Sequence, residues 1–120
     1  LSRAEALAGG RVLLTCWNLA DLEGGEPFAR GSDDVYRILQ SVEGVEVVVF
    51  LREEGPGRIS VGLRSSGRTD VGRAAQSLGG GGHPRAAGCT LFGTLEEARR
   101  RVLEELERRL EPQPGARSGP

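Results

Sequence analysis

The sequence predicts an α/β fold, a mixed β-sheet of about four to five strands flanked by helices. Short apolar runs with the length of strands alternate along the chain with segments whose apolar residues recur at helical spacing. Glycine or proline stands between many of these segments and separates them. Because 120 residues is the size of one domain, we expect residues 1–110 to form it and residues 111–120, rich in proline and glycine, to form a flexible tail.

The first strand is expected at Arg11–Trp17, because RVLLTCW is an apolar run too short for a helix and follows a Gly-Gly pair. An amphipathic helix is expected next, over residues 32–44. It opens with Ser32 and two aspartates, its apolar residues are spaced three and four apart, and Gly44 ends it.

Two more strands, Val45–Arg52 and Arg58–Ser65, are separated by EEGPG, whose proline and glycines favour a hairpin. In the second strand, isoleucine, valine and leucine alternate with serine, glycine and arginine. Neighbouring side chains of a strand point to opposite faces, so Arg64 is expected on the polar face and not in the core.

A short helix is predicted by TDVGRAAQSLG, with Thr69 or Asp70 as its cap and Gly79 as its left-handed stop. Pro84 is expected in the first turn of another helical piece, where a missing N–H has no cost. CTLF, at Cys89–Phe92, is expected to form the last strand.

The last helix begins at a capping box, in which Thr94 and Glu97 are expected to bond each other's backbone N–H groups. The apolar residues that follow line one face of this helix: Leu95, Ala98, Val102, Leu106 and Leu110. We expect that face to pack on the sheet.

Composition limits the function. The formal net charge is −1 and all 16 basic residues are arginine, so a globally basic surface is not indicated. No apolar span approaches the roughly 18 residues of a membrane helix and no signal peptide is evident, so we expect a soluble, cytoplasmic protein without a membrane partner.

Cys16 and Cys89 lie in apolar runs and are expected to be buried thiols, although a disulfide is not excluded. The chain begins at Leu1 without any methionine, which indicates part of a longer product.

The stretch GGGGHPRAAG, Gly79–Gly88, places four glycines before His83, the only histidine of the chain. Successive glycines can turn their N–H groups toward one point and let a ligand approach the main chain, which suits a phosphate or a base edge. A helical turn at Pro84 would add further N–H groups. His83 can bond a phosphate or stack on a base, and Arg85 and Arg64 can bind phosphate. These residues predict a polar pocket for a phosphorylated ligand.

A plainer interpretation is also open. In it, Gly79–Gly82 is only a closely packed connection, His83 is a helix cap or a partly buried structural residue, and Arg64 is a solvated strand end. The run also lacks the lysine of a GxxxxGK[ST] phosphate-binding loop.

The segment VGLRSSGRTDVGRAAQSLGGGGHPRAAGCTLFG, Val61–Gly93, resembles the DHH-associated domain, the C-terminal substrate-binding domain of DHH phosphoesterases. The shared features are a strand ending in LRS, a short helix after TDV, and GGGH followed two residues later by AAG. Upstream, VLLTCWNLADL and DDVYRILQSVEGVEVVVFLREE are similar to the version found in oligoribonuclease/pAp phosphatases of the NanoRNase type. By element order the resemblance covers roughly residues 11–108.

The resemblance implies substrate recognition without catalysis. In these enzymes a preceding DHH domain holds two divalent metals, usually manganese, and the two domains close around the substrate. This chain has no DHH motif, and one histidine cannot build a two-metal centre, so we expect no catalytic residue, metal ligand or cofactor here and an inactive isolated chain. The residues that the resemblance assigns to substrate binding are Arg64, Ser65, Gly80, Gly81, Gly82 and His83, and Arg85 is included beside them.

The implied partners are the DHH domain of the same parent protein and either short single-stranded RNA or a mononucleotide such as pAp; a homodimer is left open. Two alternatives share the GGGH region, a cyclic-dinucleotide phosphodiesterase and a single-strand DNA exonuclease. A third is a non-catalytic tRNA-binding or oligomerisation module like the C-terminal region of alanyl-tRNA synthetases. The near-neutral charge and the absence of lysine disfavour that third class.

Overall fold

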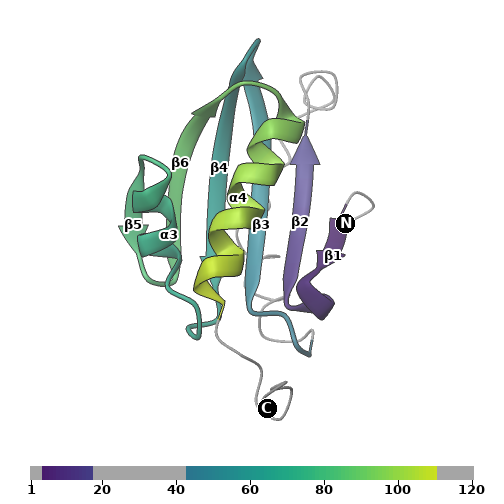
Figure 1. Ribbon diagram of the computed structural model, residues 1–120, viewed down its shortest axis with the longest axis vertical. Coiled ribbons are helices and arrows are strands. Elements are labelled where there is room, and N and C mark those ends of the chain that lie inside the picture. The colour runs from purple at the N-terminus through teal and green to yellow at the C-terminus, as the bar shows by residue number, and fades with distance from the viewer. Residues whose placement is uncertain (1–3, 18–42, 111–120) are drawn as a thin grey trace.

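The computed structural model describes residues 4–17 and 43–110. Within these ranges the strands form one six-stranded sheet with the order β1-β2-β3-β4-β6-β5. The helices α3 and α4 lie on one face of this sheet (Figure 1). The predicted α/β class is confirmed, but the number of strands was underestimated because β1 and β5 carry no periodic signal.

Strand pairing makes the sheet mixed. β2 (Val12–Trp17) and β3 (Val47–Gly55) are parallel, whereas the other neighbouring pairs are antiparallel. Residues 32–42 of the expected helix and the tail 111–120 lie outside the described residues, whereas the expected end of that helix, Gly44, lies in a turn with a φ of 91°. The other elements are β1 (Ala4–Leu7), a 3-10 turn (Ala8–Gly10), β4 (Arg58–Ser65), α3 (Val71–Ser77), β5 (Gly81–His83), β6 (Ala86–Phe92) and α4 (Leu95–Arg109).

The hairpin expected between β3 and β4 is present, and the chain turns at Pro56 and Gly57. Gly57 has a φ of 75°, a conformation that favours glycine. Along β4, isoleucine, valine and leucine are buried while the alternate residues are half-buried or exposed up to Arg64. The predicted alternation is therefore confirmed, and Arg64 points away from the main core.

The main hydrophobic core lies between the sheet and the two helices. Its sheet side comes from alternate residues of β2, β3, β4 and β6. Burial of one such aliphatic side chain stabilises the fold by roughly 1.5–3 kcal/mol, so this layer holds both helices on one face. The helical residues of the core, each at most 2% exposed, are Val71, Ala74, Ala75, Ala98, Val102 and Leu106.

Both described helices begin where the sequence predicts. The Asp70 carboxylate accepts the Arg73 N–H at 3.1 Å and caps α3. At α4, the Thr94 hydroxyl accepts the Glu97 N–H at 3.0 Å, and the Glu97 carboxylate accepts the Thr94 N–H at 2.8 Å. These bonds with Thr94 lower the pKa of Glu97. Each such cap is worth about 1 kcal/mol of stability.

The segment after α3 differs from the prediction. No helical turn begins near Pro84; instead Gly81–His83 forms the edge strand β5 and the chain turns at Pro84 and Arg85. β6 begins at Ala86, three residues before the expected strand start at Cys89. Pairing between β5 and β6 bonds the backbone across two strands, which a short helical turn cannot do.

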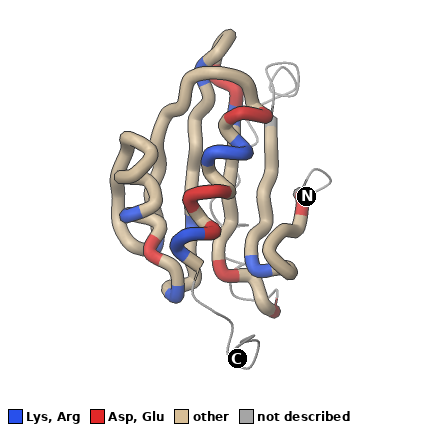
Figure 2. Tube along the Cα trace, viewed as in Figure 1, with Lys and Arg blue, Asp and Glu red and all other residues tan. Residues whose placement is uncertain are grey.

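Charged residues of both signs alternate along the exposed side of α4 (Figure 2). Glu105 is the exception, because it is only 3% exposed. Arg108 and Arg109 each donate a hydrogen bond to its carboxylate at 2.7 Å. Arg109 also bonds the Ser77 hydroxyl at 2.8 Å, so this cluster ties α4 to α3.

Candidate functional site

Three neighbouring strands bring Arg64 and His83 into one row. Both residues lie opposite Ala86 of β6 in the sheet register. Their neighbours Leu63 and Ala87 belong to the core beneath the helices, so the row faces the other side of the sheet. We call Arg64, Ala86 and His83 the polar row. Because strands lie about 4.8 Å apart, its two polar side chains flank one methyl group with their Cα atoms about 10 Å apart.

A second row on the same face consists of glycines. Gly62, Gly88 and Gly81 pair across β4, β6 and β5, two residues along from the polar row. All three are half-buried. A β-carbon built on Gly62 would lie 3.4 Å from Cδ2 of Phe50, so that ring borders the row. A β-carbon on Gly88 would lie 2.7 Å from the Val61 carbonyl oxygen, so packing requires glycine there, and the row leaves partly exposed main chain beside the polar row.

The glycine run does not form the expected concavity of successive N–H groups. The N–H groups of Gly79 and Gly80 donate to the carbonyl oxygens of Gln76 and Ala75 at 3.0 and 2.7 Å. These donors therefore complete the end of α3. The predicted anion-binding loop is wrong for these two residues, and so is the helical turn that was to support it.

Packing explains two other glycines of the run but not Gly81. A β-carbon on Gly80 would collide with the carbonyl oxygen of Gly88. One on Gly82, where φ is 145°, would lie 2.5 Å from Cα of Ala87. At Gly81 a β-carbon would meet nothing within 4 Å. The plainer interpretation thus accounts for Gly80 and Gly82, while Gly81 has no steric need to be glycine.

Arg64 and Arg85 are cations without a carboxylate partner among the described residues. Nη1 of Arg64 donates to the Leu63 carbonyl oxygen at 2.9 Å, which holds the side chain near its own strand. Arg85 is exposed in the turn between β5 and β6. Guanidinium groups without a carboxylate partner are suited to bind phosphate or carboxylate groups.

Ser65 connects Arg85 to the loop after β4. The Ser65 N–H donates to the Arg85 carbonyl oxygen at 2.9 Å, and its hydroxyl accepts the Gly67 N–H at 3.0 Å. Ser65 is only 3% exposed, so its hydroxyl lies inside this turn and apart from the polar row. Gly67 has a φ of 126°, and a β-carbon there would lie 2.9 Å from Nη2 of Arg85. The Arg85 guanidinium therefore rests on the Gly67 backbone.

The sequence did not reveal a buried ion pair next to this loop. Glu46 is 6% exposed, and Arg11 donates to its two carboxylate oxygens at 2.7 Å and 3.1 Å. The partners are 35 positions apart, so no local pattern could have indicated their pairing.

A polar pocket of about 590 Å³ lies on the other side of β5, between α3 and the end of α4. The two arginines that line it already interact with other side chains of the fold. Arg109 is bound to Glu105 and Ser77, and Arg73 lies 3.7 Å from Asp70. The pocket does not include the polar row, and each of its arginines already contacts a carboxylate, so it is a weaker candidate for the site.

Two other kinds of site would require metal-ligating side chains or a reactive thiol. The described residues contain no group of three or more His, Cys, Asp or Glu side chains that could hold a metal ion. This donor set does not fit the two-metal centre of DHH enzymes. Cys16 and Cys89 are free and half-buried, so they are less buried than the sequence predicts, and burial raises the pKa of both thiols, which disfavours the reactive thiolate. No helix in ranges 4–17 and 43–110 is long and apolar enough to cross a bilayer.

Comparison with known proteins gives one sequence relative of high similarity. NrnA from Thermus thermophilus, a bifunctional oligoribonuclease and PAP phosphatase, is 45% identical over 80 residues. The match covers 66% of this chain and 24% of the relative. The chain thus spans about a quarter of that relative's length.

Solved structures share the fold. An exopolyphosphatase-related protein from Bacteroides fragilis superposes with a TM-score of 0.71 at 27% identity, over 89% of this chain and 32% of that one. A pGpG-specific phosphodiesterase from Vibrio superposes with a TM-score of 0.56 at 17% identity, over 88% and 36% of the two chains, and supports the fold alone. The DHHA1 domain family matches residues 29–111, a range that includes both rows and the glycine run. The chain therefore belongs to the DHHA1 domain family.

Proposed function

We propose that this chain is the substrate-binding domain of a DHH phosphoesterase that hydrolyses short oligoribonucleotides, pAp or both. Its membership of the DHHA1 domain family and its similarity to an oligoribonuclease and PAP phosphatase support this function. In this proposal the divalent metals, manganese among them, belong to a DHH domain of the parent protein. The present chain supplies no catalytic group.

The observation that carries the proposal is the pairing of Arg64 and His83 across Ala86, beside a row of three glycines. A guanidinium and an imidazole can both donate to one terminal phosphate. The neighbouring glycine row lets a sugar or a base approach the main chain without steric obstruction. This arrangement suits the end of a nucleotide better than it suits an extended acidic surface.

Each predicted residue then has a physical role. Arg64, His83 and Arg85 bind phosphate, and Gly81 allows close approach. Gly80, Gly82 and Ser65 hold the strand and the turn that present these groups. Fixing one end of the substrate places its scissile phosphate at the metal centre, so the contribution to catalysis is positioning, which can be worth several kcal/mol.

An amide NMR titration tests the proposal on the chain itself, in metal-free buffer. The ligands are pAp, a diribonucleotide, adenosine and inorganic phosphate. We expect saturable shifts at Arg64, Gly81, His83 and Arg85 with pAp and the diribonucleotide, and weaker binding of either fragment. The matched site control is the pocket between α3 and α4, whose Arg73 amide should not move.

If no nucleotide shifts the amide resonances of the polar row, the proposal is contradicted. Tighter binding of a cyclic dinucleotide would favour a cyclic-dinucleotide phosphodiesterase as the parent enzyme. Tighter binding of a deoxyribonucleotide would favour a single-strand DNA exonuclease. Binding of tRNA with shifts outside the two rows would favour the tRNA-binding module.

A further inference from the structure

Glu46 lies at the point where two strands and one loop meet. The N–H groups of Glu46 and Val47 donate to the Arg11 carbonyl oxygen at 2.7 and 3.1 Å. The Arg11 side chain in turn donates to both Glu46 carboxylate oxygens at 2.7 and 3.1 Å. The start of β3 is therefore bound to the residue that precedes β2 through both main chain and side chains.

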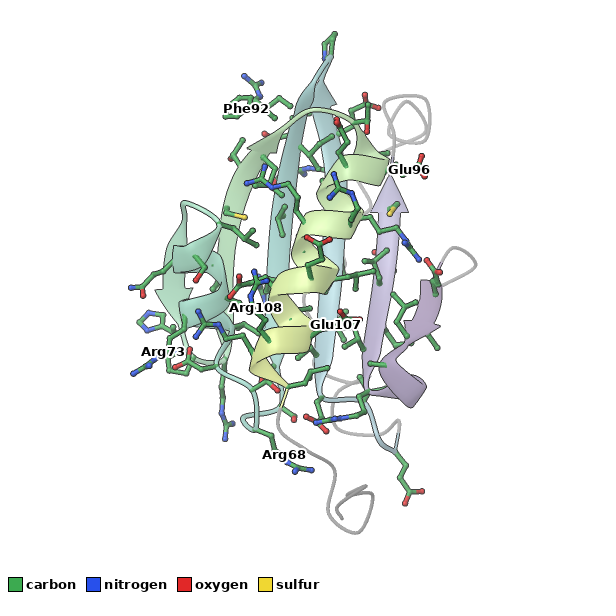
Figure 3. All side chains as sticks on the ribbon, in the orientation of Figure 1. Arg68, Arg73, Phe92, Glu96, Glu107 and Arg108 are labelled. Atoms are coloured by element: carbon green, nitrogen blue, oxygen red, sulfur yellow. The ribbon has the colours of Figure 1, made fainter. Side chains whose placement is uncertain are left out.

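The same glutamate holds the loop after β4, residues 66–69. Its carbonyl oxygen accepts the Ser66 N–H at 2.8 Å, and its Oε1 lies 3.5 Å from the Thr69 hydroxyl that donates to it. Nη1 of Arg68 lies 3.7 Å from Oε2, and Figure 3 shows Arg68 at the lower end of the molecule, far from Phe92. Both ends of this loop are thus tied to Glu46.

A buried ion pair can contribute less to net stability than its short distances suggest. Desolvation of two charges can cancel their attraction, and apolar replacements of a buried pair are often neutral or stabilising. The Glu46 carboxylate also contacts Thr69 and Arg68 of the loop, and the same loop carries Gly67, against which the Arg85 guanidinium lies.

We propose that Glu46 is a positioning residue that acts through Arg85. Together with Arg11 it fixes the loop so that Gly67 supports the Arg85 guanidinium in an orientation that meets the terminal phosphate of a nucleotide. This inference rests on the proposed function, because it assigns Arg85 to a phosphate. It predicts that Glu46 affects affinity without touching the ligand.

The test compares two buried carboxylates of the same chain. Glu46→Gln removes the charge that holds Arg11, and Glu105→Gln does the same to another carboxylate that is 3% exposed and bound by two arginines. In wild type and variants, urea unfolding gives stability, calorimetry gives the Kd for pAp, and NMR gives the resonances of Gly67 N–H and Arg85 Nε–H without ligand.

We expect Glu46→Gln to weaken pAp binding about tenfold and to shift both resonances, since a charge-assisted hydrogen bond is misaligned. Glu105→Gln should lose stability with an unchanged Kd and unchanged resonances. In the background of Arg85→Gln, the Glu46 substitution should have no further effect on the Kd, as expected for residues that act as a unit. If Glu46→Gln does not fold, Glu46→Asp, which keeps the charge but withdraws it from the loop, takes its place.

The proposal is overturned if Glu46→Gln lowers stability but leaves the Kd and the Arg85 resonance unchanged. Equal loss of binding in Glu105→Gln would overturn it too, because general destabilisation would then suffice. If the wild type binds neither pAp nor a diribonucleotide, the proposed function fails, whereas the resonances of Gly67 and Arg85 in the free variants still decide whether Glu46 positions Arg85.

Discussion

Arg64 and His83 lie opposite the same residue, Ala86, although a loop, a helix and a glycine run separate them in the sequence. Two strands that are distant in sequence thus present one polar side chain each on a single face of the sheet. Under the proposed function, the nearby residues therefore fall into two groups, those that would contact a ligand and those that hold the strands.

Replacing Arg64 by glutamine should weaken pAp binding about tenfold, because a charge-assisted hydrogen bond to phosphate is lost. The difference should shrink at high salt, which screens the charge. Calorimetry at low and high ionic strength measures both effects. The matched control is Arg100→Gln, which should leave the Kd unchanged. Arg100 lies on the exposed side of α4, where its Nη1 is 3.7 Å from Oε2 of Glu104. Equal losses in the two variants would contradict a specific role for Arg64.

The glycine run should separate into framework and ligand positions. Gly82→Ala is expected to lower the free energy of unfolding by more than about 2 kcal/mol, because φ is 145° and the new methyl group meets Ala87. Gly81→Ala should change it by less than about 1 kcal/mol, since the space there is open. Urea unfolding measures both values. A Gly81→Ala variant that is stable yet binds pAp more weakly would show that a ligand approaches this main chain; unchanged binding would remove Gly81 from the site.

Replacing Thr15 by valine should increase the stability of the fold. Its Oγ1 is buried without a hydrogen-bond partner among the described residues. Valine has the same shape and no polar group to desolvate, so Thr15→Val should raise the free energy of unfolding by about 1 kcal/mol. Thr94→Val is the control: it removes the cap of α4 and should cost about 1 kcal/mol. A loss of stability in Thr15→Val would show that the hydroxyl does have a function in the fold.

Glu105 should make stability depend on pH. Burial by itself would raise the pKa of Glu105, but hydrogen bonds from Arg108 and Arg109 outweigh it and hold this pKa below its usual value. A lowered folded-state pKa gives stability that is present above the unfolded value of about 4.3 and is lost as pH falls through the folded value. The stability difference between wild type and Glu105→Gln should therefore be largest at neutral pH and shrink below about pH 4. Urea unfolding at several pH values measures it, and a difference that does not vary with pH would contradict this.

Local signals predicted much of the fold. The β3–β4 hairpin follows from proline and glycine between two apolar runs, and both described helices begin at their predicted caps. The LRS motif lies at the end of β4 and GGGH runs into β5, so these motifs mark the two strands that carry the polar row. These features depend on residues that are close together in the chain, so the sequence displays them directly.

Pairing between distant segments could not be predicted in this way. The three-residue strand β5 has no alternation of its own and exists because β6 bonds to it, which is why a helical turn was expected at Pro84 instead. The ion pair between Arg11 and Glu46 likewise forms only when the strands assemble. The same is true of the contact between the Arg85 guanidinium and Gly67.

By itself, the sequence determined the fold class, the family and the set of residues from which the proposed site is drawn, because periodicity, caps and motifs are local. Only the tertiary structure decided which of those residues meet. It placed Arg64 and His83 on one face, put the Ser65 hydroxyl into a turn, and used Gly80 and Gly82 for packing. The reason is that strand register and close packing are properties of segments brought together from different parts of the chain.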